Sequence, residues 1–252
     1  MIDTQEVAAP GVAPPGCRIY AIGDIHGQMP LLLHMHEAIQ EDAKSFRGKR
    51  LVIVYLGDYI DRGRRSRDVL DLLSTRPLPR FERVFLRGNH EHMMLGGLYD
   101  DGVAPGWFYN GGEATLRSYG IYPEPGLQPI QCVHDMMAQL RQAVPPEHLA
   151  FLKQLKLYHR EGGFVFAHAG IKPGVPLEEQ APEDLIWIRE DFLESDETFP
   201  FIVVHGHTPS EEPEIRHNRI GIDTGAFASG RLTALVLEED RHRLLTITGR
   251  TI

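Results

Sequence analysis

Short apolar runs alternate with polar, glycine-containing turns in the first third of the chain. Three runs, at residues 18–22, 51–56 and 83–86, are rich in β-branched and aromatic residues, a pattern that predicts buried strands. Each run ends in a polar turn, and apolar residues at helical spacing follow it. Because strands that alternate with helices pair in parallel, this order would bring the three turns to one edge of a sheet.

The second half of the chain is predicted to add more strands. Segments 155–159 and 164–167 flank a glycine-containing turn, which predicts a hairpin. The runs 201–204 and 220–222 again end in polar turns, and two apolar runs between residues 232 and 247 predict a final antiparallel pair. The pattern therefore predicts an α/β fold of two packed sheets, with parallel βαβ units in its N-terminal half.

Residues 92–130 have a different character from the rest of the chain. They are rich in glycine and include Trp107, Phe108 and Tyr109, and we interpret them as an inserted cap or lid that contacts a substrate. Residues 133–155 are predicted to form two helices that a pair of prolines separates. We expect one domain over residues 17–252, preceded by a flexible arm over residues 1–16.

Composition and charge exclude several classes of function. The chain has 252 residues and a formal net charge of −9, which argues against nucleic-acid binding through a basic surface. It has only two cysteines and no Cys-x-x-Cys spacing, so a disulfide framework or thiolate metal site is not expected. No apolar run has transmembrane length and no secretory signal is evident, so we expect a cytoplasmic protein.

The predicted strand ends carry a set of oxygen and nitrogen donors. Carboxylate, imidazole and amide groups without a thiolate suit Mn²⁺, Fe or Zn²⁺ better than Ca²⁺. The set exceeds the needs of one tetrahedral ion and fits two ions, with Asp58 as the natural bridge. Two such ions activate a water and clamp an in-line displacement at phosphorus. The donors are Asp24, His26, Asp58, Asn89, His90, His168 and His207.

Five short motifs in this order resemble one known family. Gly-Asp-Ile-His-Gly, Gly-Asp-Tyr-Ile-Asp-Arg-Gly, Arg-Gly-Asn-His-Glu, His-Ala-Gly and a late Gly-His together resemble the phosphoprotein phosphatases of the calcineurin-like metallophosphoesterase superfamily. The match spans roughly residues 18–248 and is closest to the small bacterial and phage-type enzymes. The resemblance implies a two-sheet β-sandwich flanked by helices, in αββα order, with a small inserted cap.

The resemblance also implies roles for individual residues. A hydroxide activated by two divalent metals, most readily Mn²⁺, would attack phosphorus, and His90 would protonate the leaving group while Asp61 holds it. Arg62 and Arg87 would bind the phosphate oxygens, and Arg189 is a looser match to a third such arginine. The implied ligands are Asp24, His26 and Asp58 for one metal, and Asp58, Asn89, His168 and His207 for the other.

The substrate stays open between two classes. The first expectation is a serine/threonine phosphoprotein phosphatase, and the alternative is a hydrolase of dinucleoside polyphosphates of the diadenosine tetraphosphate type. A third reading is an inactive scaffold that binds phosphorylated partners. We expect a monomer that acts on phosphorylated protein or a small phosphoester, without nucleic-acid or membrane partners.

Several other polar residues have simpler interpretations. Glu91 is expected to be structural, and Asp223 to support a turn or a ligand. His205 shares a strand face with His207 but is not the expected ligand. Histidines outside the motifs are expected at the surface; they are His34, His36, His92, His134, His148, His159, His217 and His242.

Overall fold

Two β-sheets form the centre of the protein. The structure is a computed structural model that describes residues 7–8, 11–75 and 78–250. The strand order of the six-stranded sheet is β1-β11-β10-β2-β3-β4, and that of the five-stranded sheet is β5-β6-β7-β9-β8. The strands of the first sheet are β1 (Val7–Ala8), β2 (Cys17–Ile22), β3 (Arg50–Tyr55), β4 (Glu82–Phe85), β10 (Arg231–Glu238) and β11 (Arg241–Thr248). The strands of the second are β5 (Tyr158–Glu161), β6 (Phe164–Ala167), β7 (Ile202–His205), β8 (Glu214–Ile215) and β9 (Arg219–Gly221).

The parallel pairings follow the predicted pattern. Strands β2, β3 and β4 pair in parallel, as do β6, β7 and β9. The predicted hairpin is the antiparallel pair of β5 and β6, and the predicted final pair is β10 with β11. In the expected N-terminal arm, Val7–Ala8 pair with β11, whereas residues 1–6 and 9–10 lie outside the described residues.

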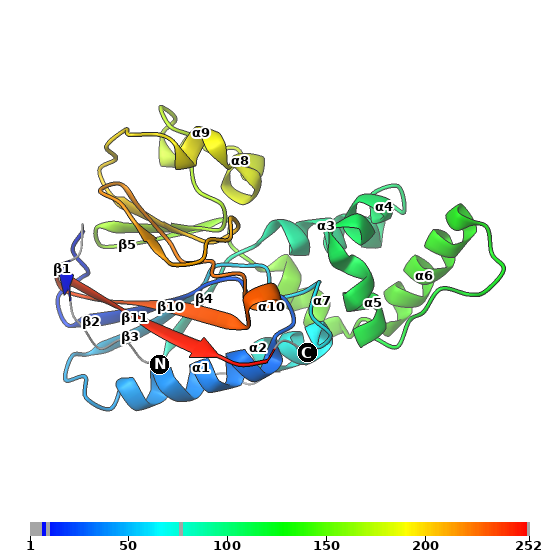
Figure 1. The fold of residues 1–252 in the computed structure, drawn as a ribbon, viewed down its shortest axis with the longest axis horizontal. Helices are drawn as coiled ribbons and strands as arrows, with labels where there is room; N and C mark the ends of the chain where they lie inside the picture. The colour runs from blue at the N-terminus through cyan, green and yellow to red at the C-terminus, as the bar shows by residue number, and fades with distance from the viewer. Residues whose placement is uncertain (1–6, 9–10, 76–77, 251–252) are drawn as a thin grey trace.

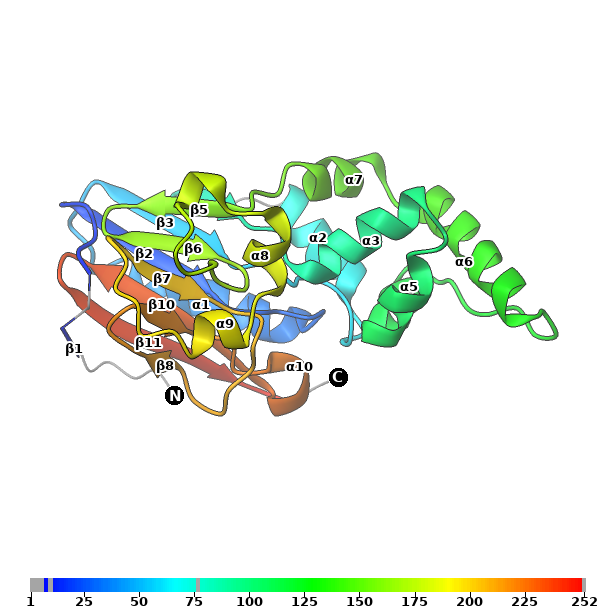
Figure 2. The same cartoon turned by 90° about the horizontal axis from the view of Figure 1, so that it is seen from above.

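Helices cover the outer face of each sheet, so the fold has four layers. Buried side chains from both sheets, including Ile19, Val54 and Val204, form the apolar layer between them. Helices α1 (Met29–Asp42) and α2 (Ser66–Thr75) pack on the first sheet. A short 3₁₀ turn (Leu177–Glu179) and helices α8 (Pro182–Trp187) and α9 (Glu190–Leu193) cover the second (Figures 1 and 2). This is the predicted αββα arrangement.

A helical segment extends from one end of the sandwich (Figure 1). It contains α3 (Asn89–Tyr99), α4 (Ala104–Trp107), a π-helical turn (Phe108–Gly112), α5 (Glu113–Ser118) and α6 (Pro129–Ala143), and α7 (Pro146–Lys153) leads back to the sheets. The aromatic residues that were predicted to contact substrate differ in their exposure to solvent. Trp107 is fully buried, whereas Tyr109 is almost fully exposed. Part of the segment is therefore core.

The expectation that histidines outside the motifs lie at the surface is wrong for three of them. His36 is buried on the inner face of α1, where its Nε2 lies 2.8 Å from the Tyr55 hydroxyl. His148 is buried between the hydroxyl of Tyr119 and the carboxylate of Asp71, and His242 is buried as well. A buried imidazole needs a polar partner, and partners distant in the sequence could not be foreseen from local pattern.

Candidate metal centre and phosphate-binding site

The predicted donors meet where the parallel strands of both sheets end. Asp24 and His26 follow β2, Asp58 follows β3, and Asn89 begins α3 just after β4. His168 follows β6 and His207 follows β7 of the second sheet. Since all five strands run in the same sense within their sheets, their carboxyl ends bring these side chains into one buried cluster.

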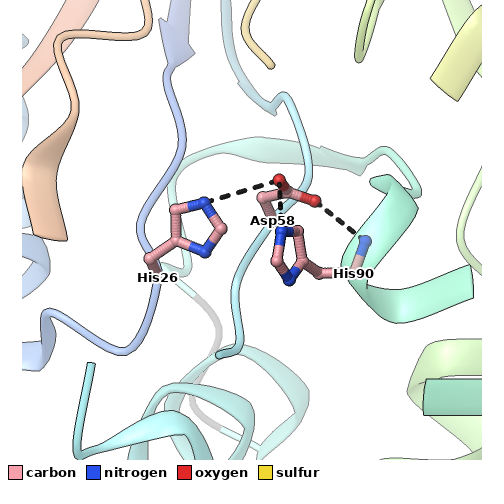
Figure 3. Close-up of side chains that lie close together, drawn as sticks. All are labelled: His26, Asp58 and His90. Carbon is pink, nitrogen blue, oxygen red and sulfur yellow. Dashed lines mark hydrogen bonds and ion pairs between the residues drawn. The ribbon is translucent and has the colours of Figure 1, made fainter. Parts of the chain in front are cut away.

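The first half of the cluster surrounds one oxygen of Asp58. His26 Nε2 lies 3.5 Å from Asp58 Oδ2, and His90 Nε2 lies 3.7 Å from the same oxygen (Figure 3). His26 is oriented by its other nitrogen, because Nδ1 lies 2.8 Å from the carbonyl oxygen of Ile60. The three buried residues His26, Asp58 and His90 form a group whose ligand atoms are close enough to hold a metal ion.

The second half of the cluster surrounds the other Asp58 oxygen. His168 Nε2 lies 3.4 Å from Asp58 Oδ1. The side-chain oxygen of Asn89 lies 3.0 Å from His168 Nε2 and 3.1 Å from His207 Nδ1. Asp58, His168 and His207 make a second group suited to a metal ion, so Asp58 belongs to both groups.

Unpartnered polar atoms show that the cluster fits divalent metals. Asp24 Oδ1 and His207 Nε2 are buried without a hydrogen-bond partner within the described residues. Burial, together with nearby Asp223 and Asp58, raises the pKa of Asp24 well above its usual value. A bound cation would satisfy these atoms and relieve the repulsion among buried carboxylates.

The histidines of the cluster are favoured in the form that binds metal. Burial lowers the pKa of His26 to about 3 and that of His207 to about 2, and it lowers the pKa of His168 as well. A neutral imidazole offers a lone pair to a cation, whereas an imidazolium does not. These three side chains are therefore ready to ligate a metal at neutral pH.

His90 differs from the other histidines because a carboxylate holds it. His90 Nδ1 lies 2.7 Å from Asp61 Oδ2, and both side chains are buried. Burial alone would lower the pKa of His90, but Asp58 and the hydrogen bond to Asp61 outweigh it, and the pKa is raised. With Nδ1 bound to Asp61, Nε2 is the free donor and faces Asp58.

Two residues of the inserted segment hold Asp61 in turn. The indole nitrogen of Trp107 donates to Asp61 Oδ2 at 2.7 Å, and the Thr115 hydroxyl donates to Asp61 Oδ1 at 2.5 Å. The Asp61 backbone N–H donates to Thr115 Oγ1 at 2.9 Å. No sequence pattern indicated these contacts, because Trp107 lies in a stretch that was interpreted as a substrate cap.

Two of the three predicted arginines, Arg62 and Arg189, lie close to residues of the cluster. Arg62 Nη1 lies 3.4 Å from His26 Nε2, and its guanidinium carbon lies 4.5 Å from the centre of the ring of Phe227, which belongs to α10 (Ala226–Ser229). Arg87 keeps a buried Nε without a partner in the described structure. Arg189 donates to the hydroxyl of Thr208, the residue after His207, at 3.0 Å.

Three further polar residues of the region, Glu91, His205 and Asp223, belong to neither metal-binding group. Glu91 accepts hydrogen bonds from the backbone N–H groups of Asp58 at 2.9 Å and Tyr59 at 2.8 Å, and so shapes the loop after β3. His205 packs on Phe192 and approaches Arg219, outside both metal-binding groups. Asp223 accepts from the Gly225 backbone N–H at 2.8 Å.

Comparison with known proteins agrees with this geometry. The sequence profile described as calcineurin-like phosphoesterase matches residues 17–229. The chain belongs to the calcineurin-like phosphoesterase family. It is therefore a metallophosphoesterase, a hydrolase, and the arrangement of His and Asp groups indicates divalent metals.

Relatives within the family carry two kinds of name. The asymmetrical bis(5'-nucleosyl)-tetraphosphatase PrpE of Bacillus thuringiensis (strain Al Hakam) is 23% identical over 234 residues, which cover 85% of this chain and 88% of the relative. Serine/threonine-protein phosphatase 2 of Escherichia coli (strain K12) is 27% identical over 226 residues, which cover 85% of this chain and 90% of that relative.

A crystal structure of an assumed diadenosine tetraphosphatase has the same fold. Its TM-score is 0.64 at 21% identity, over 97% of this chain and 99% of that one. Within the described residues, no helix of this protein is long and apolar enough to cross a membrane.

Proposed function

We propose that the protein is a phosphomonoester hydrolase that acts on phosphoserine and phosphothreonine in proteins. The observation that carries this proposal is the buried His90–Asp61 pair beside Asp58. A serine or threonine alkoxide is a strongly basic leaving group, so its departure needs a proton. The imidazole of His90, protonated and with its Nε2–H directed toward Asp58, supplies it.

The six predicted ligands would hold two divalent metals. Asp24, His26 and Asp58 would hold one ion, and Asp58, Asn89, His168 and His207 would hold the other. When bound, such metals lower the pKa of water and stabilise charge on both ends of an in-line displacement at phosphorus. The donor set fits Mn²⁺, and Fe or Zn²⁺ would also suit it.

The arginines bind and orient the phosphate. Arg62 carries a guanidinium that is fixed over the Phe227 ring and adjacent to His26, where it would contact phosphate oxygens. Arg87 and Arg189 complete the set from the neighbouring loops. Their planar donors match phosphate oxygens and stabilise negative charge that develops in the transition state.

Hydrolysis proceeds by direct attack of water, without a phosphoenzyme. The site offers acid, carboxylate and guanidinium groups for this route. Hydrolysis of a phosphomonoester made chiral at phosphorus with oxygen isotopes tests it: the configuration at phosphorus should invert. Retention of configuration would indicate two displacements through a covalent intermediate.

A second candidate substrate is a dinucleoside polyphosphate. It is favoured by a hollow lined by Arg62, Arg64, Ala114, Arg117 and Tyr122, whose three guanidinium groups suit more than one phosphate. The name of the Bacillus thuringiensis relative supports the same class. A panel of phosphoserine, phosphothreonine and phosphotyrosine peptides with dinucleoside tetraphosphates, supplemented with Mn²⁺, decides between them. Activity confined to the dinucleotides would overturn the first candidate.

A further inference from the structure

The hollow beside the metal centre has a strongly basic lining. It encloses about 440 Å³, and its wall includes Arg62, Arg64 and Arg117. Arg62 connects it to the site, because Arg62 Nη1 lies only 3.4 Å from His26 Nε2. Arg62 therefore lines the hollow and is also the residue that we propose to bind the phosphate group that is hydrolysed.

The positive charge of the hollow is only weakly neutralised. Arg117 pairs with Glu113 at 2.8 Å, but both side chains are exposed, and exposed pairs contribute little. Within the described parts of the chain, neither Arg62 nor Arg64 forms an ion pair with a carboxylate. Three arginines gathered on one wall stand out in a protein whose net charge is −9.

The backbone fixes the position of this wall. The Arg62 N–H donates to the carbonyl oxygen of Gly111 at 3.2 Å, which joins the loop after β3 to the π-helical turn. A Cβ at Gly111, where φ is +101°, would lie 2.9 Å from Arg62 Cγ. Because α5 follows that turn directly, Arg117 is held on the same side as Arg62 and Arg64.

We propose that this hollow is a second phosphate-binding subsite, which holds a phosphate group of the substrate beyond the one that is hydrolysed. The inference rests on the proposed phosphoesterase function and extends it to substrates with two or more phosphates. Guanidinium groups are the side chains best matched to phosphate oxygens. The second phosphate comes from another phosphorylated residue of a protein or from the chain of a dinucleoside polyphosphate.

Tyr122 distinguishes these two sources. Its side chain is 61% exposed and lines the hollow, so its ring is available to stack on a base. A dinucleotide would use the ring together with the arginines. A phosphopeptide would use the arginines alone.

The first test measures binding without turnover. Inorganic tripolyphosphate is titrated calorimetrically into the wild type, the double variant Arg64→Gln/Arg117→Gln and the control Arg65→Gln/Arg216→Gln. The control arginines are exposed, pair with Asp68 and Glu214, and do not line the hollow. We expect about tenfold weaker binding for the hollow variant, as for loss of one charged contact, and no more than a twofold change for the control. Equal affinity in the two double variants would overturn the subsite.

The second test measures substrate preference. The ratio of kcat/KM for a doubly phosphorylated peptide, or for a dinucleoside tetraphosphate, to that for nitrophenyl phosphate should fall about tenfold in the hollow variant. Tyr122→Ala should lower the ratio only if the dinucleotide is the source. Unchanged ratios for both substrates would overturn the proposal. If no substrate is turned over, the proposed function fails, and the calorimetric comparison still decides the subsite.

Discussion

Five residues of the site hold a backbone conformation that side chains other than glycine rarely adopt. The φ angles of His26, Asp58, Asp61, Arg62 and His207 lie between +45° and +71°. Each such residue costs roughly 1–3 kcal/mol. Part of the compensation comes from buried hydrogen bonds, such as those that Glu91 accepts from the loop after β3. The strained conformations orient side chains that we propose as metal ligands, and the Asp61 that holds the proposed acid His90, in directions that a relaxed turn would not allow.

Asp58 should be the residue on which metal binding depends most. Replacing it with Asn keeps its shape but removes the charge shared by both metal-binding groups. We expect Asp58→Asn to weaken metal binding by at least roughly tenfold, since even changes outside the ligand shell cost this much. Metal content after gel filtration measures the effect.

Asp61→Asn is the matched control for this substitution. Its carboxylate contacts His90, Trp107 and Thr115 and lies outside both metal-binding groups. The Asp61→Asn variant should therefore keep its metals, and its kcat should fall. Full metal occupancy in Asp58→Asn would contradict the bridging role.

His90→Ala should depend on the leaving group. Loss of the acid should lower turnover of phosphothreonine peptides by roughly 10²–10⁴-fold, whereas nitrophenyl phosphate, whose leaving group needs no proton, should lose far less. Parallel assays of the two substrates with His90→Ala and the wild type measure these losses. Equal losses on the two substrates would exclude His90 as the general acid.

At the scale of elements, the inserted helices belong to the site as much as the strands do. Trp107 and Thr115 reach Asp61 across 46 and 54 positions of the sequence. Strand ends were predictable because the apolar runs and the motifs coincide. Contacts between the inserted helical segment and the loop after β3 were not predictable. A glycine-rich sequence has no regular spacing of apolar residues from which its packing could be inferred.

Thr115→Val tests whether the insertion positions the general acid. Valine matches threonine in shape but removes the hydroxyl that binds both the Asp61 carboxylate and its backbone N–H. Hydrogen bonds to charged groups are worth about 1.5–3 kcal/mol, so we expect roughly tenfold lower kcat on phosphothreonine peptides. Thr115→Ser retains the hydroxyl and should restore most of the rate. If both variants lose the same activity, the role is one of packing alone.

The buried His36 between α1 and β3 should make stability fall in mild acid. Burial lowers its pKa from 6.5 to about 4, so the folded state favours the neutral ring while the unfolded chain takes up a proton first. This contribution is present above pH 6.5 and is lost as pH falls toward 4. Between pH 7 and pH 5 it amounts to about 2 kcal/mol.

Urea unfolding of His36→Gln measures that contribution. The variant cannot titrate at this position, so its stability should fall less than that of the wild type between the two pH values. His34→Gln, which removes an exposed histidine from the same helix, should follow the wild type. Identical pH dependence of His36→Gln and wild type would refute this assignment.

For the whole molecule, the two sheets depend on each other through the site. Asp24, Asp58 and Asn89 come from the loops of the first sheet, and His168 and His207 from those of the second. The order of motifs predicted this convergence, because parallel strands with aligned ends share one edge. The hollow with Arg64, Arg117 and Tyr122 was not predictable, since it arises from the docking of α5 against the loop after β3.

Removal of metal should therefore loosen the contact between the sheets and lower the thermal stability. Metals that bind only the folded state stabilise it by about 2.7 kcal/mol at a hundred times their dissociation constant. For a chain of this size we expect chelation to lower Tm by roughly 5–10 °C. Calorimetry with chelator and with added Mn²⁺ measures the shift. Asp58→Asn should start from a lower Tm and respond much less to Mn²⁺, because the ligand common to both metal-binding groups is gone. An equal response of variant and wild type would mean that Mn²⁺ stabilises the protein elsewhere.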